Sequence, residues 1–466
     1  MKVNEEKNSI FDGVVIDTEE QRMDAMDLAL TIFPEDHELT LDELDEILST
    51  DVKFDKISKN IMFLLFLLTY TDSDQQNTDM TGAPSIGKTY TVKCLSWYFP
   101  KEDLEGYDGA TPRSFHYDSK RKRLVLTNKD LEYPVFEEID WTRKPQKGDN
   151  LQVWQDWTEY RRKFVYMRDL ERKIVIFRDL PNYQLVKNLR PTLSHDEKYS
   201  RYCPVNKNMK TETIFIKGFF TCAICTTFSR QEPEERDRFW HLNPQWTEDK
   251  EKAVLDLIDR RNSDPDFMKS LELDPKRIWL KNRIHDIRSL NINEVYIPKE
   301  IVEKIRGWFD EHYQRKRPKK SRDYPRFYSL VKAWALLNHR NRKSEQRNGK
   351  KILWCDEKDF EVAVELYKDI ASANEIGLSP EGYSLWTEIV KPLLNGEDGV
   401  TIRQIHQRYI EVTKRSMGDK RLKGFLHMFA DCGLCIEDHQ GRGKPTLYYA
   451  ISNVPTNEEI EATFRQ

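Results

Sequence analysis

The chain has few of the sequence features typical of secreted proteins, of proteins stabilised by bound metal or of membrane-spanning proteins. It has only 7 cysteines in 466 residues, without a paired framework, which argues against a disulfide scaffold and favours a reducing compartment. Two C-x-x-C spacings, Cys222/Cys225 and Cys432/Cys435, raise zinc as an alternative, but no His or Cys partners follow at zinc spacing. The apolar run Ile61–Leu68 is too short to span a bilayer and predicts a buried helix, and the acidic N-terminus does not fit a signal peptide. We therefore expect a cytoplasmic protein without a membrane partner.

Charge is nearly balanced over the whole chain but divided unevenly along it. The net charge is −4, yet residues 1–60 carry about −11, so the rest carries about +7. Residues 314–351 are the most basic stretch. Segregated positive charge favours contact with nucleic acid, although for a charge run taken alone a solvated loop is the favoured interpretation. At this length two or three domains are expected.

One motif organises the remaining sequence. It fits G-x-x-x-x-G-K-[ST], the phosphate-binding loop, and consists of Gly82, Ala83, Pro84, Ser85, Ile86, Gly87, Lys88 and Thr89. The glycines let backbone N–H groups face a phosphate, Lys88 can reach the β- and γ-phosphates, and the Thr89 hydroxyl can hold Mg²⁺. Residues 90–97 predict a helix whose N-terminus faces the anion. The alternative is a plain glycine turn before a helix. Because residues 75–81 are polar, the preceding strand is expected to be short or at a sheet edge.

Apolar runs alternate with helical patterns over residues 57–230, which favours an α/β fold. The run Lys173–Asp179 predicts a buried strand that ends in an acid, and Asp179 is assigned to the Mg²⁺ site. The strand predicted at 219–227 ends in Thr227, where it can touch the γ-phosphate or an attacking water. Between these elements, 124–126 and 133–139 predict short strands and 152–168 predicts a helix.

Three further segments have recognisable patterns. Residues 198–217 predict a β-hairpin with a polar tip. Residues 380–452 predict three helices followed by a hairpin with a basic turn, which describes a winged helix. Its candidate DNA contacts are Lys420, Arg421 and Lys423 on the presumed recognition helix, and Arg442 and Lys444 on the wing. A protein-contact role for this module is the alternative. Residues 1–60 predict peripheral acidic helices that cover a basic surface or contact a partner.

The order of these parts resembles that of an AAA+ ATPase, in particular the divergent minichromosome-maintenance-like helicases of archaeal viruses and plasmids. The resemblance covers about residues 57–450, and it implies an α/β phosphate-loop core with a helical lid before the winged helix. By the same resemblance Arg238 is the arginine finger, Arg326 the second sensor and Thr227 the first sensor. The hairpin lysines Lys207 and Lys210 become candidate DNA contacts in a ring pore.

The sequence also departs from this family. The family acid pair is Asp-Glu, with the Glu as the base that activates water, whereas Leu180 follows Asp179 here. Either another acid replaces that Glu, or hydrolysis is slow or absent. The acids considered are Glu137, Glu138, Asp196 and Glu197. The family's N-terminal DNA-binding collar is missing as well, because residues 1–56 are too few for it.

The resulting prediction is an ATP- and Mg²⁺-dependent DNA helicase or translocase of a mobile element, acting as a homo-oligomeric ring. The alternative is a nucleotide-switched, DNA-binding replication initiator or loader with weak or no hydrolysis. A small-molecule kinase fits poorly, because it needs neither the winged helix nor the finger. The predicted domains are an acidic N-terminal segment (1–56), the ATPase core (57–312), a helical lid (313–375) and the winged helix (380–455).

Overall fold

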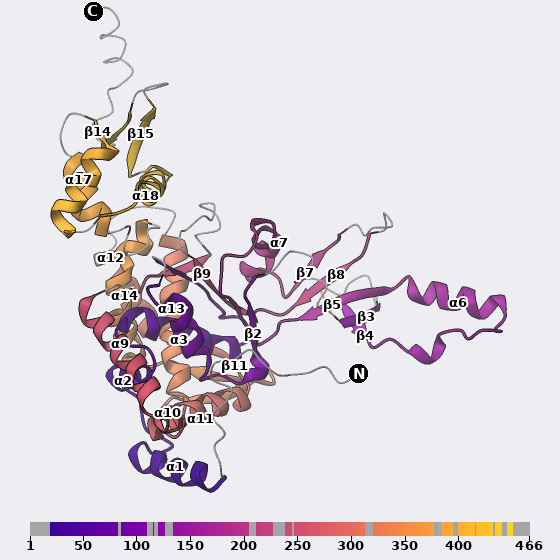
Figure 1. Ribbon diagram of the computed structural model, residues 1–466. Helices are drawn as coiled ribbons and strands as arrows, with labels where there is room; N and C mark the ends of the chain where they lie inside the picture. The colour runs from indigo at the N-terminus through magenta and orange to yellow at the C-terminus, as the bar shows by residue number, and fades with distance from the viewer. Residues whose placement is uncertain are drawn as a thin grey trace, which may run out of the picture.

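The computed structural model (Figure 1) shows an elongated chain in which a sheet-and-helix body carries a projecting arm and a C-terminal module. It describes residues 19–82, 85–109, 115, 120–125, 134–204, 211–226, 238–244, 247–312, 320–376, 382, 384–394, 399–414, 416–431, 434–439 and 445–450. Among the helices in these ranges, none is long and apolar enough to cross a membrane.

A five-stranded parallel sheet lies at the centre of the body. Its strand order is β10-β1-β9-β6-β2, and every neighbouring pair runs parallel. The strands are β1 (Asn77–Thr81), β2 (Leu104–Tyr107), β6 (Ile174–Phe177), β9 (Thr221–Thr226) and β10 (Phe239–Leu242). The expected α/β fold with a phosphate-loop topology of strand, loop and helix is confirmed. The alternative of an edge position for β1 is wrong, because this five-residue strand lies between β10 and β9.

The polar strand β1 is fully buried because its side chains meet partners inside the fold. Asn77 Nδ2 donates to the Leu193 carbonyl oxygen at 2.8 Å. Asp79 lies opposite His241 in the parallel ladder, and His241 Nδ1 is 3.6 Å from Asp79 Oδ2. Buried polar groups are generally paired, but both carboxylate oxygens of Asp79 are buried with no hydrogen-bond partner among the described residues. The polar sequence nevertheless did not prevent β1 from occupying the interior of the sheet.

Helices cover both faces of the parallel sheet, as such sheets require. Alternate residues of β6 join two different cores: Ile174 and Ile176 join the main core, and Val175 and Phe177 join the smaller one. The main core also holds α3 (Lys56–Leu67) and α4 (Lys88–Ser96), and the smaller core holds α7 (Tyr183–Leu193). The buried helix predicted at 61–68 is therefore confirmed in α3 and the turn that follows it.

A second five-stranded sheet leads from the body into the arm (Figure 1). Its order is β4-β3-β5-β8-β7, with β3 (Lys120–Val125), β4 (Val135–Glu137), β5 (Phe164–Asp169), β7 (Tyr199–Tyr202) and β8 (Ile214–Lys217). The hairpin predicted at 198–217 is confirmed, since β7 and β8 pair antiparallel. The helix predicted at 152–168 is partly wrong. Helix α6 (Leu151–Arg161) ends early, because residues 164–169 form β5 between β3 and β8.

The region after the parallel sheet is mainly helical. Its helices are α9 (Glu248–Ser263), α10 (Phe267–Glu272), α11 (Pro275–Leu290), α12 (Lys299–His312), α13 (Lys320–Leu337) and α14 (Glu357–Ile376). A small sheet of order β11-β13-β12 joins them, with β11 (Ile292–Tyr296), β12 (Ser344–Arg347) and β13 (Lys350–Trp354). Short 3-10 turns are η1 (Leu68–Tyr70), η2 (Lys101–Asp103), η3 (Trp141–Arg143) and η4 (His339–Asn341). Residues of α11 to α14 pack into the same main core as the parallel sheet.

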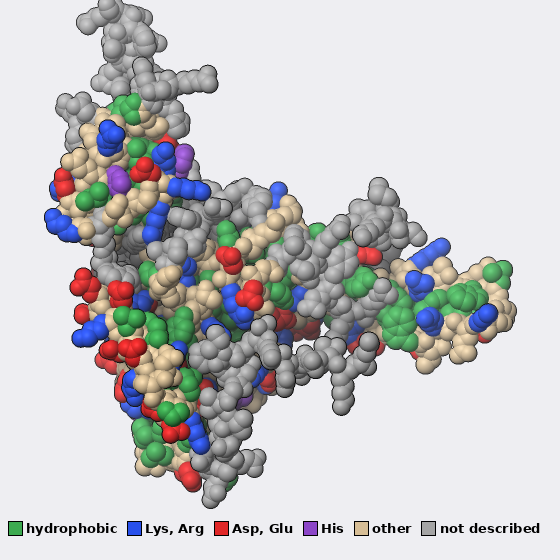
Figure 2. Space-filling view, in the orientation of Figure 1, with side chains coloured by type: hydrophobic (Ala, Val, Ile, Leu, Met, Phe, Trp, Pro, Cys, Tyr) green, Lys and Arg blue, Asp and Glu red, His purple; other side chains and the backbone are tan. Residues whose placement is uncertain are grey.

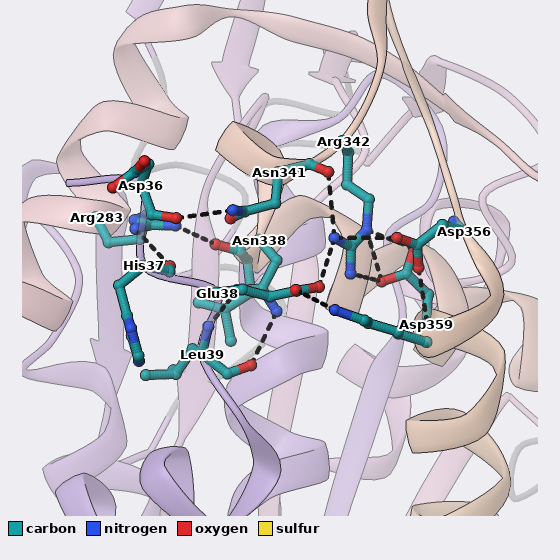
Figure 3. A network of polar contacts seen from close by, with 12 residues as sticks. Asp36, His37, Glu38, Leu39, Arg283, Asn338, Asn341, Arg342, Asp356 and Asp359 are labelled. Atoms are coloured by element: carbon teal, nitrogen blue, oxygen red, sulfur yellow. Dashed lines mark hydrogen bonds and ion pairs between the residues drawn. The ribbon is translucent and has the colours of Figure 1, made fainter. Parts of the chain in front are cut away.

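The described part of the acidic N-terminal segment, from residue 19 onward, is not wholly peripheral, which corrects the expectation for it. It forms α1 (Glu19–Ile32) and α2 (Leu41–Ser49), and the predicted capping box of Thr40 and Glu43 is present at the start of α2. Four residues of α2 are buried in the main core, namely Leu41, Leu44, Ile47 and Leu48. Residues 35–39, here called the strap, run from α1 to α2 across α11 and α13 (Figure 3).

The strap carries acidic side chains to a basic cluster, as one of the sequence alternatives proposed. Glu38 Oε1 is 2.8 Å from Arg342 Nη1, and Glu35 Oε2 is 2.6 Å from Arg340 Nη1. The Asn338 side-chain amide is paired with both backbone groups of Leu39 (Figure 3). Part of the basic stretch 314–351 is therefore neutralised inside the chain.

The C-terminal module has a core of its own. It comprises the π-helix η5 (Leu385–Val390), α16 (Lys391–Leu394), β14 (Val400–Thr401), α17 (Ile402–Thr413), α18 (Asp419–Asp431), β15 (Cys435–His439) and β16 (Thr446–Ala450). The three strands form an antiparallel sheet of order β14-β16-β15. The predicted three helical segments and terminal hairpin agree with these elements to within a few residues.

Candidate nucleotide-binding site

The phosphate loop lies between the carboxyl end of β1 and the start of α4, the context in which this motif binds phosphate. Ser85 (φ 63°) and Gly87 (φ 94°) are both in the left-handed region. At Gly87 this favours glycine, and such a reversal turns backbone N–H groups inward to form an anion-binding concavity. Gly82 N donates to the Thr226 carbonyl at 3.3 Å, which ties the loop to β9. Ala83 and Pro84 lie outside the described residues.

Lys88 and Thr89 open α4 and face different groups. Lys88 is 8% exposed, and its Nζ donates across the loop to the Gly82 carbonyl oxygen at 2.8 Å. The ammonium group therefore lies across the loop, on the side from which the lysine of this motif reaches phosphate oxygens. The Thr89 hydroxyl donates to the Arg178 carbonyl at 3.4 Å. This contact brings Thr89 to the residue that precedes Asp179, so the two predicted Mg²⁺ ligands lie on neighbouring segments.

Asp179 lies two residues beyond β6 and is exposed. Its Oδ1 accepts a hydrogen bond from Leu180 N at 2.8 Å. The side chain of Leu180 packs against the smaller core. The position that carries the family's base is thus apolar here, and it contributes no carboxylate to the loop.

None of the four acids considered as replacements lies at the phosphate loop. Glu137 belongs to β4, and Glu138 forms an ion pair with Lys122 of β3 in the second sheet. Asp196 and Glu197 follow α7, and the neighbouring His195 contacts the Phe220 carbonyl just before β9 begins. That carbonyl is at the amino edge of the parallel sheet, whereas the loop is at the carboxyl edge. The proposal of these acids as a base within the same chain is therefore wrong.

A different carboxylate lies at the carboxyl edge. Asp108 directly follows β2, which pairs with β6, and its Oδ1 is 2.9 Å from Arg178 Nη1. It is exposed, so it is open to solvent beside the segment that carries Asp179. The sequence reasoning missed Asp108 because it did not recognise the short strand β2. An acid immediately after Leu104–Tyr107 was the signal that could have found it.

The thiol of Cys225 shows that this side of the loop is shielded from water. Burial raises the pKa of Cys225 to about 12, while a hydrogen bond with Thr89 and the charge of Lys88 act in the opposite direction. The thiol is neutral at physiological pH and packs in the main core. Among the described residues, no group of three or more His, Cys, Asp or Glu could hold a metal ion by itself.

The predicted arginines lie far from the loop of their own chain. Arg238 immediately precedes β10, and its Nε donates to Ser194 Oγ at 2.7 Å. Arg326 is 8% exposed, with Nη2 donating to the Phe239 carbonyl at 2.8 Å. Since Phe239 pairs with Asn77 at the start of β1, both arginines contact the amino edge of the sheet, roughly 13 Å of strand from the loop. The contacts described for these two arginines are therefore at the edge of the sheet opposite the loop.

The remaining predicted site residues are only partly described. Thr227, Lys207, Lys210, Arg442 and Lys444 lie outside the described residues. On α18, Lys420 and Lys423 are exposed, as a DNA-contact role requires. Arg421 is half-buried, and its guanidinium lies 6.0 Å from the ring centroid of Phe425 on the same helix.

Comparisons with known proteins find remote similarities only. No family model matches the sequence, and no curated protein matches it. A structure described as "SCCmec type IV Cch - active helicase" is 9% identical, with 89% of this chain and 71% of that chain covered and a TM-score of 0.33. The C-terminal region of NrS-1 is 13% identical, with 88% and 75% covered and a TM-score of 0.24. The Aeropyrum pernix ORC1 protein in complex with DNA is 11% identical, with 87% and 90% covered and a TM-score of 0.21. At these TM-scores the similarities carry no argument about function.

Proposed function

We propose that this chain is an ATP-dependent DNA helicase or translocase of a mobile genetic element, built on an AAA+ core of the minichromosome-maintenance-like type and acting as a homo-oligomeric ring. The observation that carries the proposal is the arrangement of Lys88, Thr89 and Asp179 around the loop after β1. ATP with Mg²⁺ supplies a γ-phosphoryl group whose transfer to water releases free energy. The residues present fit that ligand, since the cation of Lys88 and the hydroxyl of Thr89 lie at the start of α4, and the carboxylate of Asp179 lies on the segment that Thr89 contacts.

In this proposal each residue has a separate task. Lys88 exchanges its bond to the Gly82 carbonyl for phosphate oxygens, and Thr89 and Asp179 hold Mg²⁺ and its waters. Asp108 orients the attacking water in place of the glutamate that Leu180 replaces. Arg238 and Arg326 complete the site of a neighbouring chain, because neither reaches the loop of its own. Thr227 remains the proposed first sensor.

The proposed DNA contacts are on two elements. Lys420, Arg421 and Lys423 of α18, with Arg442 and Lys444, would bind DNA if the C-terminal module acts as a winged helix. Lys207 and Lys210, which lie in the sequence between β7 and β8, would contact a strand in the ring pore. The domain boundaries predicted from the sequence are retained as part of this proposal.

A second function is favoured by one observation. Leu180 packs into the core where a catalytic glutamate is usual, so a chain that binds ATP without hydrolysing it is chemically reasonable. Such a chain would be a nucleotide-switched DNA-binding initiator or loader. ATP-dependent separation of a duplex distinguishes the two functions.

The test is steady-state ATP hydrolysis with and without single-stranded DNA, together with a direct measurement of ATP binding. We expect DNA to stimulate turnover, and Lys88→Ala and Arg238→Ala each to lower it on the order of 100-fold or more. Asp108→Asn should lower turnover by a similar factor while ATP binding is retained. The matched control is Glu361→Gln, an exposed acid on α14, which should change nothing.

The outcomes separate the alternatives. Wild-type chain that binds ATP but does not hydrolyse it excludes the motor and favours the initiator. Turnover that survives Asp108→Asn shows that another group orients the water. Absence of ATP binding excludes both functions.

A further inference from the structure

The arm ends in an apolar and basic tip, defined here as residues 141–163. Trp141, Leu151 and Trp154 are 53%, 74% and 46% exposed, which is unusual for large apolar side chains in one place. The tip is nevertheless built on packed rings, because Trp157 lies 5.8 Å from Phe164 between ring centroids. Six of its basic residues are exposed, Arg143, Lys144, Lys147, Arg161, Arg162 and Lys163, against three exposed acids, Asp149, Asp156 and Glu159.

Helix α9 presents a second exposed apolar face with the opposite charge. Val254, Leu255 and Ile258 are 36%, 53% and 45% exposed. The exposed acids of α9 are Glu248, Asp249, Glu251, Asp256 and Asp259, and its exposed bases are Lys252 and Arg260. On α9 the exposed acids outnumber the exposed bases by three, and on the arm tip the exposed bases outnumber the exposed acids by three. The two surfaces therefore carry opposite net charges of equal size. Both surfaces combine apolar side chains with charge, as protein interfaces do.

The two surfaces lie on opposite sides of the molecule. In Figure 1 α6 is at the far right and α9 at the left of the body. Figure 2 shows the green and blue side chains of the arm at the right, and acidic side chains along the left edge of the body. A single chain cannot bring these surfaces together, but two copies can, and a contact between different surfaces repeats from copy to copy.

Helix α9 is also connected to the phosphate loop. Lys250, in its first turn, has Nζ 3.4 Å from the Ile86 carbonyl oxygen of the loop. Arg261, in its last turn, donates from Nη2 to the Tyr90 hydroxyl of α4 at 2.6 Å. Whatever docks on α9 is therefore mechanically linked to the segment that binds phosphate.

We propose that the arm tip of one copy docks on the exposed face of α9 in the next copy. The occupant is a second copy of this chain, because its charge complements α9 and both surfaces leave apolar side chains uncovered. The contact gives the proposed ring its head-to-tail direction, and in this respect it rests on the proposed function. It also places the neighbour's tip against the helix that holds the phosphate loop, so self-association and ATP binding favour each other.

The first experiment is a charge exchange on the full-length chain, measured by sedimentation velocity with and without ATP. Lys144→Glu with Lys147→Glu, and separately Glu251→Lys with Asp259→Lys, should each weaken self-association at least tenfold. Chains with all four changes should recover self-association, because the substituted acids on the arm tip then face the substituted lysines on α9 and the charges attract again. The control Lys299→Glu reverses an equally exposed charge on α12 and should have no effect.

The apolar part has a control that is matched in exposure. Leu255→Ser should weaken association, whereas Leu28→Ser, at 51% exposure on α1, should not. Differently tagged chains with Leu151→Cys and Leu255→Cys, in a background where the exposed Cys203 and also Cys432 are serine, should form a disulfide between copies on mild oxidation.

Several results would overturn the proposal. They are unchanged association in the charge variants, no recovery in the fourfold variant, no disulfide between copies, or a wild-type chain that stays monomeric with ATP and DNA. Loss of DNA affinity without loss of association would assign the tip to nucleic acid instead. Failure to bind ATP in an assembly that still responds to the charge exchange would exclude the proposed function while leaving this contact in place.

Discussion

Two basic clusters look alike in the sequence and differ in the structure. Around η4, Arg340 is paired with acids of the strap and of α11, and Arg342 with acids of the strap and of α14. Figure 3 shows the pairs of Arg342. On α18, Lys420 and Lys423 are exposed on a module with its own core. The first cluster therefore stabilises the chain, and the second is open to a partner. A run of positive charge indicates a ligand only where the fold leaves it without internal partners.

The largest effect that would test this contrast is expected at Arg342. Its side chain is 1% exposed, with Nη2 2.7 Å from Oδ1 of the fully buried Asp359. Arg342→Met should lower the free energy of unfolding by about 3–5 kcal/mol, because it leaves a buried carboxylate unpaired. Urea denaturation measures the loss, and Lys420→Met is the exposed control, expected to stay within about 0.5 kcal/mol.

A compensating change sharpens the same prediction. Adding Asp359→Leu to Arg342→Met removes the unpaired carboxylate and should recover most of the lost stability. If Arg342→Met alone costs less than about 1 kcal/mol, the strap cluster is not a structural element, and the contrast with α18 fails.

The next effect concerns pH, through His339, the buried first residue of η4. Burial, and then the charge of Arg283, lower the pKa of His339 from 6.5 to about 4. The folded chain keeps this histidine neutral. Its contribution to the free energy of unfolding is therefore complete above pH 6.5 and is lost as the pH falls toward 4. The loss amounts to about 3 kcal/mol of unfolding free energy.

Unfolding measured at several pH values checks this expectation. His339→Leu should remove that part of the acid sensitivity, so the difference between variant and wild type should change steadily between pH 6.5 and 4. A difference that does not vary with pH would show that His339 is not held neutral by the fold. The pKa of Asp359 is raised to about 6, mainly by burial, so its titration changes the stability in the opposite direction. Because wild type and variant both contain Asp359, this contribution cancels in their difference.

The smallest expected effect is on DNA binding by α18. Lys420→Ala and Lys423→Ala should each weaken binding and reduce the slope of log affinity against log salt by about 1, as for the loss of one phosphate contact. Arg340→Ala should leave the slope unchanged, because its guanidinium is already held by Glu35 and Asp286. If all three variants keep the wild-type slope, the C-terminal module is assigned to a protein partner.

The sequence predicted features that are set by local pattern. The loop, the acid after β6, the capping box at Thr40 and the β7–β8 hairpin depend on residues that are close in the chain. The prediction failed where an element is very short or where its pairing partners are far away in the sequence. Strand β2 has only four residues, and β5 was assigned to a helix because its pairing with β3 and β8 comes from distant segments. Asp108 was missed for the first reason, and the ion pairs of the strap for the second.

The shared main core has a consequence for motion. Residues from the strap's neighbouring helices, from the parallel sheet and from α12, α13 and α14 all contribute to it. A helical lid that hinged independently would have to expose part of that core to water, at about 25 cal/mol for each Å² of apolar surface. The C-terminal module, with a separate core, carries no such cost. Heating should therefore show two cooperative units. Under the proposed function, nucleotide turnover is expected to move whole chains, or this module, rather than the proposed lid.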